Sequence, residues 1–84
     1  MLIYLNSGEC IEVQDATTAE RRNGSLVCLD ERGRTTATFQ ASDVESFTAN
    51  EEIAEAMKEE VCEDLTVVSD GKVVAEERES DPAG

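Results

Sequence analysis

Short apolar or alternating runs, separated by turn residues, fill the first half of the chain. One run alternates so that Ile11 and Val13 share a face, whereas 26–29 is apolar on both faces and typical of a central strand. Asn23-Gly24 predicts a tight hairpin, because both central positions of a type I′ turn need positive φ. We therefore expect β-strands at 1–5, 10–13, 17–22, 25–30 and 35–40.

The next apolar residues define shorter and less regular elements. Residues 41–43 fit a turn or a single helical turn, and 44–48 fit a short strand, although apolar residues three apart there also fit a helical turn. Further along, 65–68 and 73–75 flank the turn-forming residues 69–72. This pattern predicts a second hairpin.

An amphipathic helix is the clearest element of the second half. Ile53, Ala54, Met57 and Val61 recur at helical spacing and form one apolar stripe. This stripe predicts that the helix packs on the sheet through one side and leaves its other side in water.

The helix has two candidate starting points. Thr48 forms a capping box with Glu51, and Asn50 is a rival N-cap. Either start suits the sequence, and we expect the helix to end near Glu63 or Asp64.

Together these elements predict one α+β domain. We expect a small antiparallel β-meander with one amphipathic α-helix packed on it, and the sheet either stays flat or curls into a small barrel. The domain should cover residues 1–76. Residues 77–84 are charged, have little apolar surface to bury, and are expected to form a disordered acidic tail.

The composition narrows the partners of this domain. Twenty acidic residues against seven basic ones give a net charge of −13 over 84 residues. Such a field repels nucleic acids and anionic membranes and attracts basic protein surfaces. A core this small is thin, so a homodimer is an accessible way to gain stability.

The first residues bear on location. The opening apolar run lacks the basic n-region of a signal peptide and is interrupted at Asn6, and no stretch reaches the length of a bilayer span. We therefore expect a cytoplasmic protein.

Three cysteines, Cys10, Cys28 and Cys62, are an odd and widely spaced set without a C-x-x-C pair. We expect them to be reduced, because small secreted scaffolds usually carry an even and denser set. A zinc site would need all three thiols and a carboxylate brought together by the fold, so neither a metal nor another cofactor is expected.

Catalytic residue patterns are missing from the sequence. The chain has no histidine, which removes the usual general base and the Ser-His and Cys-His pairs. No nucleotide-binding, zinc-protease or EF-hand spacing occurs. We expect a protein that is not an enzyme.

Acidic residues concentrate on the predicted helix. Seven acids and one lysine lie within 51–64. Five of the acids fall within one arc of about 120° on a helical projection. Like charges four residues apart, and acids near the helix C-terminus, both oppose helix stability. These residues are the candidate partner-binding set: Glu51, Glu52, Glu55, Glu59 and Glu63.

Two functions fit this pattern. In the first, the chain is a protein-interaction module, with a role as an inhibitor or regulator, that offers its carboxylates to a basic, nucleic-acid-binding surface of a partner. In the alternative, it is a homo-oligomeric structural or accessory subunit that associates through its sheet edge. The acidic face then only keeps the protein soluble, or reflects an acid-rich proteome.

Overall fold

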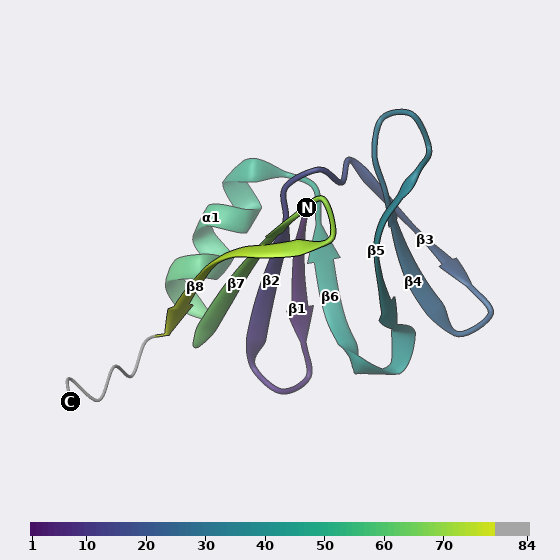
Figure 1. Ribbon diagram of the computed structural model, residues 1–84. Helices are drawn as coiled ribbons and strands as arrows, with labels where there is room; N and C mark the ends of the chain where they lie inside the picture. Colours follow the sequence, from purple (N-terminus) through teal and green to yellow (C-terminus); the bar gives the residue numbers. More distant parts are fainter. Residues whose placement is uncertain (79–84) are drawn as a thin grey trace.

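The computed structural model describes residues 1–78, and the remaining residues, 79–84, are most of the predicted tail. Residues 1–78 form two β-sheets and one α-helix (Figure 1). The elements in chain order are β1 (Leu2–Leu5), β2 (Glu9–Val13), β3 (Thr18–Arg22), β4 (Ser25–Leu29), β5 (Thr35–Gln40), the 3-10 turn η1 (Ala41–Asp43), β6 (Val44–Thr48), α1 (Glu51–Glu60), β7 (Asp64–Ser69) and β8 (Lys72–Arg78).

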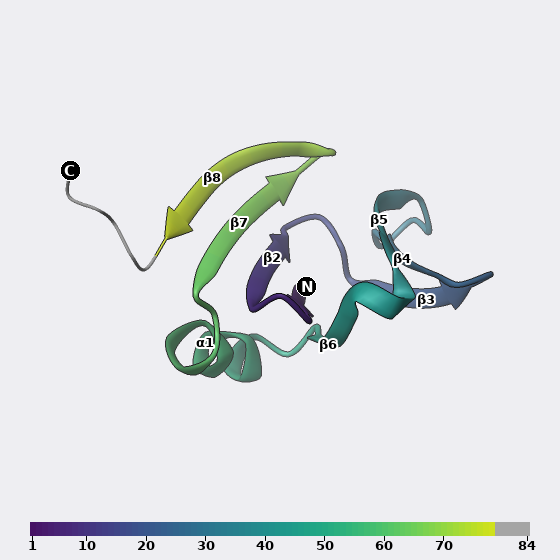
Figure 2. The same cartoon turned by 90° about the horizontal axis from the view of Figure 1, so that it is seen from below.

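The strands do not form a single meander, and they do not close into a barrel. One sheet has the order β6-β1-β2-β7-β8, and the other has the order β3-β4-β5. Strand β1 is antiparallel to both β2 and β6, so β6 and β2 point the same way, and β7 joins β2 in parallel. A parallel pairing needs a crossover connection, and α1 supplies it (Figure 2). The α+β class is confirmed, but the predicted all-antiparallel order is wrong.

Both predicted hairpins are present, with the expected backbone. Asn23 and Gly24 have φ values of 48° and 81°, and Asp70 and Gly71 have values of 57° and 75°. Positive φ at both central positions gives the turn the twist that two antiparallel strands require. The turn residues therefore fix where β3 meets β4 and where β7 meets β8.

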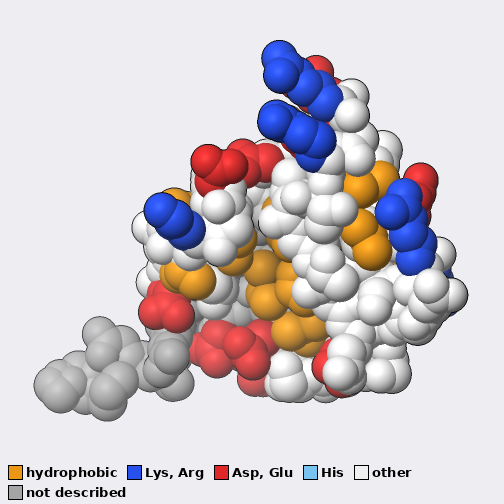
Figure 3. All heavy atoms as spheres, turned by 45° about the vertical axis from the view of Figure 1, so that its right-hand side comes forward, with side chains coloured by type: hydrophobic (Ala, Val, Ile, Leu, Met, Phe, Trp, Pro, Cys, Tyr) orange, Lys and Arg blue, Asp and Glu red, His pale blue; other side chains and the backbone are white. Residues whose placement is uncertain are grey.

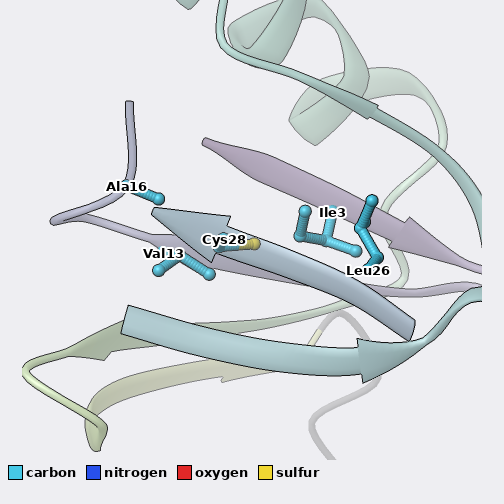
Figure 4. Packing of buried hydrophobic residues seen from close by; sticks show 5 residues of the cluster. All are labelled: Ile3, Val13, Ala16, Leu26 and Cys28. Atoms are coloured by element: carbon cyan, nitrogen blue, oxygen red, sulfur yellow. The ribbon is translucent and has the colours of Figure 1, made fainter. Parts of the chain in front are cut away.

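The hydrophobic core lies between the two sheets. Ile3 and Val13 come from the five-stranded sheet, Leu26 and Cys28 come from β4, and Ala16 lies in the connection between the sheets (Figure 4). These five side chains are at most 6% exposed. The predicted central strand is confirmed, because β4 lies between β3 and β5 and carries four buried residues.

Burial is concentrated near the N-terminus. Nine hydrophobic residues are buried, and all of them lie within residues 1–29 of the described part of the chain. The complete set is Leu2, Ile3, Cys10, Val13, Ala16, Leu26, Val27, Cys28 and Leu29. The later elements contribute partly covered side chains only.

The helix lies on the side of the five-stranded sheet that faces away from this core. Cys10 and Glu12 alternate with the core-side positions of β2, and both contact the α1 segment. Of the predicted apolar stripe, Ala54 and Met57 are half-buried, whereas Ile53 is 52% and Val61 39% exposed. The helix is thus attached by a narrower strip than its sequence predicts.

The helix boundaries differ from the prediction at one end. Asn50 is the N-cap, and its side chain accepts hydrogen bonds from the backbone N–H groups of Glu52 and Ile53. Thr48 instead accepts a hydrogen bond from the backbone N–H of Asn50. The helix ends at Glu60 rather than near Glu63.

The last strand extends two residues beyond residue 76, the expected end of the domain. Strand β8 continues to Arg78, which pairs with Asp64 of β7. The rest of the predicted disordered tail lies outside the described residues. Within residues 1–78, no helix has the length and apolar character that crossing a bilayer requires.

The core predicts a sharp contrast between two isoleucines. Ile3 is fully buried and Ile53 is about half exposed. Ile3→Val should lower the free energy of unfolding by about 0.5–1.5 kcal/mol, because it removes a buried methylene. The control Ile53→Val should change it by less than about 0.5 kcal/mol. Urea denaturation measures both, and equal effects would contradict the core described here.

Candidate functional site

Four of the five predicted partner-binding residues lie on α1. Glu51 and Glu52 occupy its first turn, Glu55 its middle and Glu59 its last turn. All four side chains are exposed. We call these four residues the acidic helix face.

Glu63 does not belong to this face. It lies in the connection between α1 and β7, and its backbone N–H donates to the carbonyl oxygen of Gly8 at 3.3 Å. Its carboxylate also lies against Gly8, in the turn between β1 and β2. The expectation that Glu63 lies on the helix is wrong, because the helix ends at Glu60, where the N–H groups of Val61 and Cys62 both donate to the carbonyl oxygen of Met57.

Lys58 is the one cation on α1, and it points toward the sheet. Its ammonium group lies 2.9 Å from a carboxylate oxygen of Glu12 on β2 and 3.3 Å from one of Glu55. The lysine side chain is only 20% exposed, whereas that of Glu55 is 70% exposed. Desolvation acts to lower the pKa of Lys58, but the hydrogen bonds to Glu12 and Glu55 outweigh it and raise that pKa overall.

The other basic residues lie elsewhere in the fold. Arg21 and Arg22 are on β3, and Arg32 and Arg34 are in the connection between β4 and β5. Arg22 pairs with Glu20 on its own strand. Figure 3 shows Lys and Arg side chains at the upper, right and left margins of the face it presents, with hydrophobic side chains in the middle. Among the described residues, none of these four arginines pairs with a carboxylate of α1.

Two of the three cysteines form a disulfide, so the expectation of reduced thiols is wrong for them. Cys10 on β2 and Cys62 after α1 are joined, with their Cα atoms 5.5 Å apart. Spacing in the sequence gave no hint of this pair, because 52 residues separate the two positions. Disulfides are uncommon in reducing compartments, so the cytoplasmic location stays a prediction.

The disulfide also bears on whether the three cysteines could bind a metal ion. Cys28 is the free thiol, and burial raises its pKa, against a smaller opposing effect of the N-terminal charge. A zinc site built from all three thiols would need the disulfide to be broken. Within residues 1–78, no group of three or more potential ligands gathers in a way that could hold a metal ion.

A cleft of about 700 Å³ opens between α1 and the neighbouring strands. Its lining combines Met1 and Ala54 with the charged group of Glu12, Glu55 and Lys58. Glu12 and Glu55 both pair with Lys58 there, so the cleft borders the contact that attaches the helix to the sheet.

A second cleft, of about 860 Å³, opens among the β2–β3 connection, the β4–β5 connection and the β7–β8 turn. Two carboxylates in its lining, those of Asp15 and Asp30, accept hydrogen bonds from these loops. Asp15 accepts hydrogen bonds from the hydroxyl of Ser69 at 3.3 Å and from the backbone N–H of Asp70 at 2.6 Å. Asp30 accepts two backbone N–H groups of its own loop, at 2.8 and 2.9 Å. The one donated by Arg34 is the main cause that lowers the pKa of Asp30.

No known protein family, curated protein or solved structure shows significant similarity to the chain. The functional proposal below therefore rests on the geometry of the chain itself.

The Lys58–Glu12 contact predicts a measurable coupling between helix and sheet. Glu12→Gln should lower the free energy of unfolding by about 0.5–1 kcal/mol at neutral pH, because both partners are largely covered. The control Glu55→Gln removes the exposed partner and should cost less, about 0.3 kcal/mol. Urea denaturation of both variants makes the comparison.

The same contact fixes a pH dependence. The pKa of Lys58 is raised above its ordinary value of 10.5 in the folded protein, so the contribution of the pair is complete below that value. It is lost as the pH rises through the higher folded pKa, where the ammonium loses its proton. A difference between wild type and Glu12→Gln that persists well above this range would contradict the pairing.

Proposed function

We propose that the chain is a non-enzymatic interaction module that presents its acidic helix face to a basic, nucleic-acid-binding surface of another protein. The observation that carries the proposal is the direction of Lys58. The only cation of α1 turns inward to Glu12, while the carboxylates of the acidic helix face stay in water. The face is therefore strongly negative toward a partner.

The spacing of the charges supports a nucleic-acid-binding partner. Glu51 to Glu59 span nine positions, and at about 1.5 Å per residue their four carboxylates amount to about one charge every 3–4 Å. One strand of DNA carries about one charge per 3.4 Å. A surface that binds a phosphate backbone is thus matched by this row, and the module acts as an inhibitor or regulator by competing with nucleic acid.

The arrangement has an energetic cost within the chain. Glu51, Glu55 and Glu59 are like charges at successive four-residue intervals, each pair costing about 0.2–0.5 kcal/mol. Glu59 and Glu60 also lie at the C-terminal end, where the helix dipole favours cations. A row of carboxylates that weakens its own helix is expected where binding requires it.

Neutralising the row tests the proposal. The variant Glu51→Gln, Glu55→Gln and Glu59→Gln should stay within about 0.5 kcal/mol of wild type, because the relief of like-charge repulsion offsets the lost Lys58–Glu55 contact, yet it should lose its partner. The control variant Glu31→Gln, Glu45→Gln and Glu76→Gln removes three exposed carboxylates elsewhere and the same net charge. It should keep the partner.

The binding measurement uses nuclease-treated lysate of the native host. Immobilised wild type and the control should capture the same nucleic-acid-binding protein at low salt and release it at high salt or on addition of a DNA oligonucleotide. The proposal would be contradicted if the helix variant captured as much of the partner as wild type does, or if capture changed neither with salt nor with added DNA.

A second candidate function, a homo-oligomeric subunit, is favoured by one observation on β8. This strand is at the edge of the five-stranded sheet, and its Val73 and Val74 are 59% and 57% exposed. An exposed apolar edge invites strand pairing with a second copy. The shift of register between Val67 and Val68 on β7 works against a long, regular pairing.

Sedimentation equilibrium separates this alternative from the first proposal. A dimer should appear at high protein concentration and become weaker in Val74→Lys, which places a charge on the edge strand. High salt should strengthen it by screening the repulsion of two strongly acidic chains. A monomer at every concentration and salt level rules this candidate out.

A further inference from the structure

Two parts of the chain differ in how many buried side chains they contain. Residues 1–48 contain every buried side chain of the described protein. We call α1, β7 and β8 the C-terminal layer. None of its residues 51–76 is buried, and its exposed apolar residues include Ile53 and Val73. The side chains of the layer therefore add no fully buried apolar group to the core.

Three kinds of contact attach this layer to the rest. Strand β7 pairs with β2 in parallel from Asp64 to Val68, and Lys58 pairs with Glu12. Asp15 accepts the hydrogen bonds from the β7–β8 turn described above. The disulfide is the only covalent attachment besides the chain itself, and it lies where the β2–β7 pairing begins.

We propose that the Cys10–Cys62 disulfide is a redox-cleavable clasp, whose reduction by a dithiol loosens the C-terminal layer from β2, the strand with which β7 pairs. This inference goes beyond the proposed function and does not depend on it. Attack at Cys62 is favoured, since this residue is half-buried in a connecting segment, whereas Cys10 is fully buried on β2.

The dithiol reductant supplies the two electrons that reduction of the disulfide requires. A thiolate of the reductant attacks the sulfur of Cys62, a mixed disulfide forms, and Cys10 leaves and takes up a proton. The second thiol of the reductant then displaces Cys62. The dithiol is oxidised to a disulfide by two electrons, and the protein gains two thiols.

The surroundings of Cys62 select among reductants. Glu60, Glu63 and Asp64 lie within two residues of it, and the chain as a whole is strongly negative. This field repels anionic thiols such as glutathione and leaves neutral dithiols and basic protein dithiols able to approach. The preferred reductant is therefore a dithiol that carries no net negative charge.

Reduction should loosen the layer without unfolding the core. The core residues Ile3, Val13, Leu26 and Cys28 contact one another within the first part of the chain. The layer, once reduced, depends on backbone pairing and on side-chain contacts near the surface. Local opening of such a unit is independent of global unfolding when the remainder keeps its own core.

Hydrogen exchange on the full chain provides the test. The protein is purified without reductant, and thiol alkylation with mass spectrometry should find one reactive thiol on unfolding, from Cys28. Neutral dithiothreitol should then lower protection of the amides in α1 and β7 by at least about tenfold while β4 keeps its protection. Glutathione should act more slowly, and added salt should narrow the gap.

Two variants complete the design. Cys10→Ser with Cys62→Ser should show the reduced pattern without any reductant. Cys28→Ala keeps the disulfide and should still respond to dithiothreitol. Three alkylated thiols in protein purified without reductant, unchanged protection of α1 after reduction, or loss of protection in β4 together with α1 would each overturn the proposal.

Discussion

The contact between the two sheets is the interaction on which the rest of the structure depends. Ile3 of β1 and Leu26 and Cys28 of β4 meet in a core that excludes water. Five of the nine buried residues of the described chain belong to this core, so it supplies a large share of the hydrophobic stabilisation. The elements that follow residue 29 pack against this part of the chain with side chains that are only partly covered or exposed.

This order of dependence explains the character of α1. The helix joins β6 to β7 across the strands between them, so the topology requires it, but its packing is shallow. Lys58 and Cys62 attach it through a salt bridge and a disulfide rather than through a broad apolar face. One side of the helix is therefore free to carry carboxylates, at a modest cost in helix stability.

Local signals in the sequence identified the elements well. The Asn23-Gly24 and Asp70-Gly71 turns and the doubly apolar β4 follow from preferences of one to four neighbouring residues. The same preferences narrowed the helix start to Thr48 or Asn50, and the structure selects Asn50. The exposed positions of Glu51, Glu55 and Glu59 follow equally from helical periodicity. The early helix end was missed because it depends on how the chain reaches β7.

The positions of the strands and turns, the region of the helix and its negative side could be predicted from the amino-acid sequence, because they depend on nearby residues. The division of the strands into two sheets, the parallel pairing of β2 with β7 and the contact of Cys10 with Cys62 could not. The tertiary structure also took Glu63 out of the acidic face and turned Lys58 toward Glu12. Each of these joins residues far apart along the chain, and their proximity follows from packing around the core rather than from any local pattern.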